Sequence, residues 1–469
     1  MGHRRERRTG RLRSGLLIGT AFVAGVSAVT FSDILGPRVG VANAFAESSD
    51  RAERHRLLTL FGDVFALVRR DYVDPVNDKD AIENAISGML TGLDPHSSYL
   101  TAAAFRDMEL ESKGAFGGLG IEVAQDDGQI KVVSRMDHMP AARAGVKIGD
   151  IITAVDGRSL KGLALDDAVD RMRGAPNTKV SLTIIRAGAS QPLHVAMTRE
   201  IIHVEVVRSR LLADKIGYIR LAEFTEPADA GIRQAVHALT GQAGGTLRAM
   251  ILDLRDNPGG LLDQAIAVAS DFLDKGEIVS TRARHAEDSE RWAAKGRDIL
   301  GGLPLVVLIN GGSASASEIV AGALQDHQRA VLVGTRSFGK GSVQTVFPLP
   351  GSGALDMTTA RYYTPSGRSI QARGVDPDII VMRDREPPRE FGDEHEADLN
   401  HILRNTEGDD PPAEPARIDL PPNAKEIPDR PPEGFPPYDP AKPDATDFQL
   451  QQALAVAKAM SIRKWVSAE

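Results

Sequence analysis

The stretch Asn310-Gly-Gly-Ser-Ala-Ser-Ala-Ser-Glu318 carries the strongest structural signal in this chain. It follows a short all-apolar segment, residues 305–309, and precedes a helix-like segment, residues 316–327. A strand, a tight glycine turn, a serine and a helix in this order lift a hydroxyl out of a sheet. The helix N-terminus behind the turn favours developing negative charge. The pattern therefore predicts an α/β fold that presents a nucleophilic serine.

A second segment, residues 334–344, offers a base for such a serine, because Lys340 and Gln344 lie four positions apart among glycines. A serine hydroxyl is a poor nucleophile until a base removes its proton. His327 lies about three helical turns from Ser315, on the order of 18 Å along the axis, and is a poor candidate. Lys340 is the better candidate if burial lowers its pKa far enough. Gln344 can orient the amine without adding charge.

The residue pattern alone does not choose the nucleophile among Ser313, Ser315 and Ser317. Ser313 also fits the N-cap of the following helix, and Ser317 directly precedes Glu318. Glu318 either caps the helix that it begins or braces the active site.

The run Asp253-Leu-Arg-Asp-Asn-Pro-Gly-Gly260 ends another apolar segment. A strand that ends in glycines directs free backbone amides outward, and either Gly259 or Gly260 can act with the amide of Ala316 as an oxyanion hole. The simpler alternative is a turn that begins a helix.

The flanking sequence indicates the domain organisation. From Ile201 to Ile380, apolar strands alternate with helices, which predicts a layered α/β domain. Residues 114–198 have the short strands and turns of a small β-rich domain, and residues 48–105 have helical spacing of apolar residues. Residues 385–443 are rich in proline and acidic residues and are a poor candidate for a packed core. Residues 445–460 form a plausible terminal helix, which can dock on the main body or on a second subunit.

The N-terminus and the composition bear on location and partners. Arginines between positions 4 and 13 precede an uncharged, mostly apolar stretch, residues 14–32, and Ala44-Phe-Ala46 offers a small-x-small cleavage pattern. This predicts a secretory signal or a retained membrane anchor, with the rest of the chain outside the cytoplasm. The net charge of −8 gives no reason to expect a nucleic-acid partner. Zero cysteines exclude disulfides and thiolate metal sites.

Three motifs resemble those of the carboxy-terminal processing proteases, also called tail-specific proteases: residues 253–260, 312–319 and 338–344. In that family the middle serine precedes the lysine by 25 positions and the glutamine follows the lysine by four, as 340 − 315 = 25 and 344 − 340 = 4 do here. The resemblance implies that Ser315 is the nucleophile, Lys340 the base and Gln344 its partner, in a crotonase-like layered core. It implies no metal and no cofactor.

The β-rich region resembles a PDZ domain through the Gly-Leu-Gly-Ile loop and residues 144–152 and 155–157. Such domains bind a peptide carboxylate on loop amides while the peptide adds a strand. The implied peptide-binding residues are Gly118, Leu119, Gly120 and Ile121. Arg173 matches a family position where a PDZ arginine contacts the catalytic region, although an exposed arginine at a helix end fits equally well. The turn Asp94-Pro-His96 also recurs in the family, and a structural role is favoured there over a metal or acid–base site.

The expected function is that of an exported, periplasmic or membrane-anchored serine endopeptidase that recognises polypeptide C-termini through its PDZ domain and cleaves near them. An adaptor protein and self-association into a homo-oligomer are further expectations. The alternatives are a catalytically silent PDZ scaffold that delivers peptides to other proteases, and an acyl transferase or amidase that acts on small substrates. The predicted parts are a signal or anchor (1–46), a helical region (47–105), a PDZ domain (106–198), a protease core (199–383), a disordered proline-rich linker (384–444) and a terminal helix (445–469).

Overall fold

The computed structural model describes residues 41–126, 128–385, 395–405, 418–422, 426–439 and 442–466. The chain divides into two compact units, residues 1–79 and residues 80–469. The apolar stretch 14–32, on which the signal or anchor prediction depends, lies outside the described residues. Within the part of the chain that is described, no helix is long and apolar enough to cross a membrane.

The smaller unit contains one long helix, α1 (Val41–Asp71), among its described residues. The helical spacing seen in the sequence is confirmed, and it places Leu57, Phe61 and Val64 on a face that is about half exposed, at 51%, 48% and 50%. α2 (Asp78–Thr91) begins at the end of this unit, and Arg69 pairs with Asp78 at 3.0 Å.

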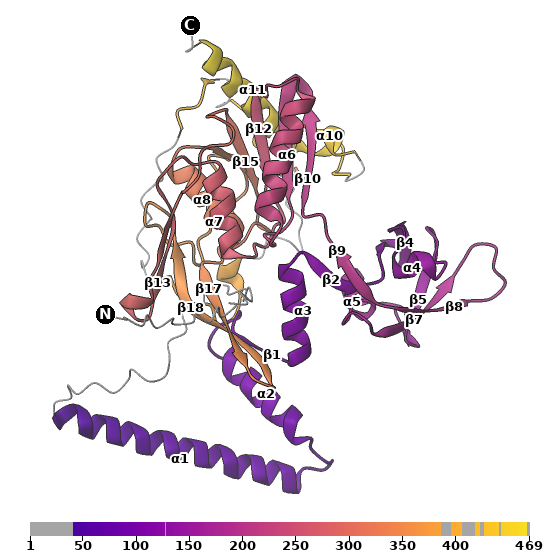
Figure 1. Ribbon diagram of the computed structural model, residues 1–469, viewed down its shortest axis with the longest axis vertical. Helices are drawn as coiled ribbons and strands as arrows, with labels where there is room; N and C mark the ends of the chain where they lie inside the picture. The colour runs from indigo at the N-terminus through magenta and orange to yellow at the C-terminus, as the bar shows by residue number, and fades with distance from the viewer. Residues whose placement is uncertain are drawn as a thin grey trace, which may run out of the picture. The chain divides into compact units, whose positions relative to one another are not determined.

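The main sheet of the larger unit has the strand order β10-β11-β12-β15-β16-β19 (Figure 1). β10 and β11 pair antiparallel, and the other neighbours pair parallel. Parallel strands need crossover connections, which helices provide here. The elements are β10 (Val207–Leu212), β11 (Ile216–Leu221), β12 (Ala249–Asp253), β15 (Leu305–Ile309), β16 (Val331–Gly334), β19 (Ile379–Ile380), α6 (Ala228–Gln242), α7 (Leu262–Asp271) and α8 (Ala316–Asp326).

Both faces of the main sheet are covered. Successive residues of a strand point to opposite faces, so Leu252 and Val307 pack with α6, α7 and α8. Ile251 and Val306 pack instead with α11 (Phe448–Val466). Burial on both faces explains the continuous apolar runs in the sequence and confirms the layered α/β prediction.

A second, antiparallel sheet has the order β1-β18-β13-β14, with β17 also paired to β18. The sequence analysis did not predict this sheet, which carries Gln344 on β17. Its strands are β1 (Ser98–Leu100), β13 (Glu277–Ala283), β14 (Arg291–Ala293), β17 (Ser342–Leu349) and β18 (Gly353–Tyr363). The remaining short elements of the larger unit are α3 (Ala102–Ser112) and the 3-10 helices Ala213–Lys215, Ala286–Asp288 and Glu396–Asp398.

The PDZ region folds around its own apolar core, in which Val132, Ile152 and Leu182 are at most 2% exposed. Its sheet has the order β3-β4-β5-β7-β8, so β3 lies at an edge. β2 (Ala115–Gly118) and β9 (Glu200–His203) pair where the chain enters and leaves the region. The other elements are β3 (Ile121–Asp126), β4 (Gln129–Arg135), β5 (Ile151–Val155), β6 (Arg158–Ser159), β7 (Lys179–Ile185), β8 (Leu193–Thr198), α4 (Pro140–Arg143) and α5 (Leu165–Met172).

The C-terminal region differs from the disordered linker that was predicted for residues 384–444. Its described parts pack on the cluster beneath α11, with Ile418, Leu420, Ile427 and Phe435 as contacts. The Phe435 ring meets the Phe448 ring edge-on at 5.3 Å. α10 (Pro443–Thr446) then leads into α11. The sequence did not predict this packing, because the region is rich in proline and these four apolar residues are spaced too irregularly to form a periodic pattern.

Candidate active site

The turn between β15 and α8 holds the three serines that the sequence left open. Ser313 Oγ donates to the carbonyl of Leu254 at 2.7 Å, and Ser317 Oγ donates to the carbonyl of Asn257 at 3.0 Å. Both side chains are fully buried, whereas Ser315 is only partly buried. The hydroxyls of Ser313 and Ser317 therefore hold the turn in place.

Ser315 has an unusual backbone conformation, with φ 53° and ψ −111°. A positive φ at a non-glycine residue is strained, and such residues cluster at functional sites. Gly259 packs directly against it: a Cβ on Gly259 would lie 2.8 Å from Ser315 Cβ and 3.0 Å from Ala316 N. Only glycine fits at position 259, so the glycine-rich end of the 253–260 run and the serine turn are built to meet.

Glu318 joins the serine turn to the lysine segment. Its Oε2 accepts hydrogen bonds from Ser315 N at 2.8 Å and Lys340 N at 2.9 Å. Its Oε1 accepts from Gly339 N at 2.7 Å and from the hydroxyl of Ser337. The sequence left two roles open for Glu318, and it performs both. It accepts a hydrogen bond from the backbone of Ser315, the N-cap of α8, and it joins the serine turn to the lysine segment.

Two opposing influences act on the pKa of Lys340. Burial lowers the pKa of Lys340, and the negative charges of Asp356, Glu396, Glu318 and Asp94 act to raise it. Burial is the largest of these influences, so the amine is easier to deprotonate than an exposed lysine.

Within the described residues, no hydrogen bond joins the three predicted catalytic side chains: none links Lys340 Nζ to the Ser315 hydroxyl or to Gln344. Gln344 Nε2 donates instead to Ser342 Oγ at 3.0 Å and to Thr358 Oγ1 at 3.1 Å. The three residues lie on segments that the hydrogen bonds of Glu318 and the β17–β18 pair hold in one body.

The Asp94-Pro-His96 turn is a brace for this region. Asp94 Oδ1 accepts from His96 N at 2.9 Å, Ser97 N at 2.8 Å and Thr358 Oγ1 at 3.1 Å. His96 Nε2 lies 2.8 Å from Glu396 Oε2. These bonds support the structural role that the sequence favoured for the turn.

His327 has a backbone partner as well, because its Nε2 bonds the carbonyl of Glu277 at 2.7 Å. Because a carbonyl oxygen only accepts, Nε2 carries a proton in this bond, which ties the His327 ring to β13.

The amides near Ser315 differ in their availability. Gly259 N donates to Asn257 Oδ1 at 2.9 Å. Among the described residues, neither Gly260 N nor Ala316 N donates a hydrogen bond. Hydrogen bonds on either side of Gly260 fix its position: Leu261 N donates to the carbonyl of Phe224 at 2.8 Å, and Phe224 N donates to the carbonyl of Gly259 at 2.8 Å.

The predicted carboxylate-binding loop of the PDZ region, residues 118–121, leads into the edge strand β3. The carbonyls of Leu119 and Gly120 accept from Ala141 N at 3.0 Å and Met136 N at 2.9 Å, which fixes the loop. A Cβ on Gly120, at φ 73°, would lie 2.3 Å from Met139 Cβ. The loop is therefore closely packed and requires its glycine.

Arg173 follows α5 and contacts residues near the entry of the PDZ region. Its guanidinium lies over the Phe116 ring at 4.5 Å and 3.8 Å from Glu111 Oε1. Burial and Glu111 raise the pKa of Glu223, and Arg173 lowers it. No ion pair or hydrogen bond in the described part of the chain joins Arg173 to Ser315, Lys340 or Gln344.

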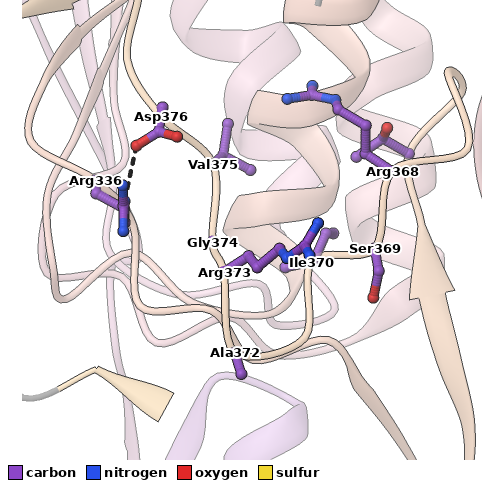
Figure 2. A pocket seen from close by; sticks show the side chains of 10 residues that line it. Arg336, Arg368, Ser369, Ile370, Ala372, Arg373, Gly374, Val375 and Asp376 are labelled. Atoms are coloured by element: carbon purple, nitrogen blue, oxygen red, sulfur yellow. Dashed lines mark hydrogen bonds and ion pairs between the residues drawn. The ribbon is translucent and has the colours of Figure 1, made fainter. Parts of the chain in front are cut away.

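A small cavity of about 180 Å³ lies beside the lysine segment (Figure 2). It is lined by residues 336, 364, 368–370 and 372–376, and the Arg336–Asp376 ion pair of 2.7 Å closes one side. None of the predicted catalytic residues lines it.

A serine on a strained strand-to-helix turn, in an α/β core that carries a PDZ fold, is the architecture of a modular serine peptidase. Comparison with known proteins agrees. Residues 215–381 match the profile of Peptidase family S41, residues 108–185 match the PDZ domain, and residues 33–104 match the Activating protease CtpB N-terminal domain.

Similar proteins extend this match over most of the chain. The carboxy-terminal-processing protease of Bartonella bacilliformis is 52% identical over 71% of this chain and 77% of its own. The probable CtpA-like serine protease of Staphylococcus aureus is 35% identical over 78% of this chain and 71% of its own. The solved photosystem II D1 C-terminal processing protease is 30% identical, covers 70% of this chain and 94% of its own, and has a TM-score of 0.42. The 52% identity to the Bartonella bacilliformis protease and the family profile show that the chain belongs to peptidase family S41 and, within it, to the carboxy-terminal-processing proteases.

Proposed function

We propose that this serine peptidase is an exported endopeptidase that cleaves polypeptides near their C-termini with a Ser315–Lys340–Gln344 site. The observation that carries the proposal is the Glu318 carboxylate, which accepts from both Ser315 N and Lys340 N. A buried carboxylate that fixes the backbone of Ser315 relative to that of Lys340 is expected in an enzyme whose serine and lysine side chains react with each other.

The proposed reaction proceeds through an acyl-enzyme. Neutral Lys340 takes the proton of the Ser315 hydroxyl as its oxygen attacks the scissile carbonyl. Lys340 then gives this proton to the leaving amine. In the second half Lys340 takes a proton from water as the water oxygen attacks the ester carbonyl. Lys340 then returns this proton to the Ser315 oxygen as the ester bond breaks, which releases the new C-terminus and regenerates the hydroxyl. The amide of Gln344 forms a hydrogen bond with the Lys340 amine and keeps the amine directed at Ser315.

The competent state requires a hydrogen bond between Lys340 Nζ and the Ser315 hydroxyl, and the described residues have no such bond. A peptide in the PDZ domain favours that state if it binds it more tightly than the resting state. Arg173, which ends α5, is the proposed link between the two domains.

The proposed oxyanion hole consists of the amides of Ala316 and Gly260. Gly259 N is the weaker candidate because it already donates to Asn257 Oδ1 at 2.9 Å. Gly259 contributes by its missing side chain, which lets the backbone approach Ser315. Each donor is worth about 3 kcal/mol of transition-state stabilisation.

The test compares wild type with Ser315→Ala and Lys340→Ala on a protein substrate that carries an unfolded C-terminal tail. Both variants are expected to lose cleavage by at least three orders of magnitude, because each removes a group that makes or breaks bonds. The exposed Ser209 and Lys275 supply matched controls, since Ser209→Ala and Lys275→Ala remove the same groups away from the site.

Cleavage by Ser315→Ala or Lys340→Ala at the wild-type rate would refute the proposed site. If the controls lose activity equally, the loss reflects damage to folding. A wild type that binds tails but never cleaves them would favour the PDZ scaffold.

The proposal extends to location, with residues 1–46 as an export signal or an inner-membrane anchor of a periplasmic enzyme. The arginines before the apolar stretch 14–32 support this orientation. Cell fractionation with N-terminal sequencing checks it, and a cytoplasmic protein with an intact N-terminus would contradict it. The adaptor protein and the homo-oligomer stay predictions. Of the two docking partners expected for the terminal helix, the main body is the one that Phe448, Leu450 and Val456 of α11 pack against.

A further inference from the structure

A buried charge cluster surrounds Arg255, which is 6% exposed and directly precedes the oxyanion segment, residues 256–260. The guanidinium donates to Asp253 at 3.0 and 2.6 Å and to Asp447 at 2.9 and 2.7 Å. Gln449 Oε1 accepts a further hydrogen bond at 3.1 Å. Each nitrogen of the guanidinium therefore has a buried acceptor, and two of these acceptors come from the C-terminal segment.

The C-terminal side of the cluster fixes the start of α11. Asp447 Oδ1 also accepts from Leu450 N at 3.0 Å, and Gln449 Nε2 donates to the carbonyl of Val381 at 2.7 Å. This segment lies outside residues 215–381, which match the peptidase profile. The family resemblance therefore assigns it no role.

The other side of the cluster leads to the nucleophile. Immediately after Arg255, Asp256 N donates to Asn310 Oδ1 at 2.8 Å, and Asn310 Nδ2 donates to Asp256 Oδ1 at 2.7 Å. The carbonyl of Asn257 accepts from Ala314 N at 3.0 Å. The backbone that follows Arg255 is thus bonded to the serine turn. A shift of Arg255 would therefore move both the oxyanion segment and the serine turn.

We infer that Asp447 is a positioning residue for the oxyanion segment. It holds Arg255, and through Arg255 the amide of Gly260, at the place relative to Ser315 that the transition state requires. The inference rests on the proposed function and deepens it, because it makes the C-terminal segment part of the catalytic apparatus.

Two physical arguments support a positioning role. Removing one carboxylate from a buried ion cluster leaves a guanidinium with donors that water cannot reach, and the surrounding backbone shifts to relieve this. A small displacement of an oxyanion donor weakens transition-state binding while ground-state binding is unchanged. The expected signature is a change in kcat with little change in KM.

The experiment uses the full-length protein with Asp447→Asn, which keeps the side-chain shape and removes the charge. At a temperature where the variant is fully folded, kcat is expected to fall at least tenfold, with KM within twofold of wild type. Asp447→Glu restores the charge and is expected to recover part of the lost rate. The matched control is Val456→Ala, which creates a cavity where α11 packs on the same sheet, at a residue that is 0% exposed.

Val456→Ala is expected to lower the unfolding temperature and leave kcat unchanged. A wild-type kcat in Asp447→Asn, or an equal loss in Val456→Ala, would overturn the inference. If the wild type cleaves, Ser315→Ala does not, and Asp447→Asn matches wild type, this inference fails and the proposed function stands. If the wild type is inactive, both fail.

Should Asp447→Asn not fold, Gln449→Leu provides the second test, because it removes only a neutral acceptor of Arg255 at 3.1 Å. Its kcat is expected to fall about threefold at unchanged KM. A wild-type kcat in this variant would then overturn the inference.

Discussion

Glu318 is the residue on which the geometry of the site most depends, because it links the backbone of Ser315 to that of Lys340, 25 residues further along the chain. Burial raises its pKa to about 7, and the hydrogen bonds from Ser337, Ser315, Gly339 and Lys340 act in the opposite direction. Each carboxylate oxygen accepts a pair of donors, so the side chain needs two equivalent acceptors.

This arrangement predicts the effect of Glu318→Gln. Whichever way the amide is turned, its NH₂ group faces two donors, either at Ser315 and Lys340 or at Ser337 and Gly339. Losing two hydrogen bonds to a charged group costs about 3 kcal/mol or more, so kcat/KM is expected to fall by at least two orders of magnitude.

Steady-state kinetics and thermal unfolding of the purified variant provide the measurement, with the exposed Glu287→Gln as the control. A folded Glu318→Gln protein with activity within threefold of wild type would show that the two segments keep their arrangement without this carboxylate.

Asp356 is a second residue with a defined electrostatic effect. It lies on β18 opposite Ser98, and its Oδ1 is buried with no hydrogen-bond partner in the described part of the chain. Burial raises the pKa of Asp356, and its negative charge raises the pKa of Lys340. Asp356 therefore favours the protonated form of Lys340, whereas the proposed mechanism needs the neutral amine.

Asp356→Asn is expected to lower the pKa of Lys340 further, because one negative charge is removed while Glu396, Glu318 and Asp94 remain. More of the amine is then neutral at a given pH, so the acidic limb of the kcat/KM profile moves to lower pH. On that limb the variant is expected to be several-fold faster than wild type, with the same plateau at high pH.

The measurement is the pH dependence of kcat/KM for wild type, Asp356→Asn and the exposed control Asp288→Asn. An acidic limb that stays in place or moves to higher pH in Asp356→Asn would contradict the assignment of Lys340 as the base.

At the scale of elements, the local patterns predicted those structures that depend on neighbours in the chain. The strand 305–309 and the helix that begins at Ala316 occur as predicted, and the strands 216–221 and 249–253 belong to the alternation of strands and helices expected between Ile201 and Ile380. Fully buried strands of a parallel sheet are continuously apolar and are therefore visible in the sequence.

The elements that were not predicted depend on distant partners. β17 and β18 pair with each other, and β18 also pairs with β1, about 260 residues away, as Ser98 opposite Asp356 shows. Most residues of these strands are only partly buried, so they lack a clear apolar pattern. The position of Gln344 relative to Lys340 therefore could not be predicted.

At the scale of the whole molecule, the chain inserts a complete peptide-binding fold into a catalytic body. β2 and β9 pair as Phe116 opposite Ile202, so the PDZ region begins and ends at one place. Such an insertion leaves the main sheet continuous, because all of its strands follow the PDZ region, from β10 onward. β3 remains an edge strand, which is the edge that a peptide strand needs.

The whole-molecule prediction concerns the substrate's own C-terminus. Amidating the C-terminus of a peptide substrate is expected to lower kcat/KM about tenfold, because loop amides of residues 118–121 favour a carboxylate. N-acetylation of the same peptide is the control and removes a charge at the other end. Equal rates for the free and amidated peptides would mean that the PDZ loop does not select substrates by their C-terminal carboxylate.

The sequence by itself determined the class of fold, the PDZ insertion and the residues that the family motifs point to, because these are recorded in short runs whose spacing is local. Only the tertiary structure gave a physical reason to prefer Ser315, since it buries the hydroxyls of Ser313 and Ser317 against backbone carbonyls. It alone placed the Asp447 carboxylate on Arg255, 192 residues away. Contacts of that kind depend on how the chain closes on itself, and no local pattern encodes them.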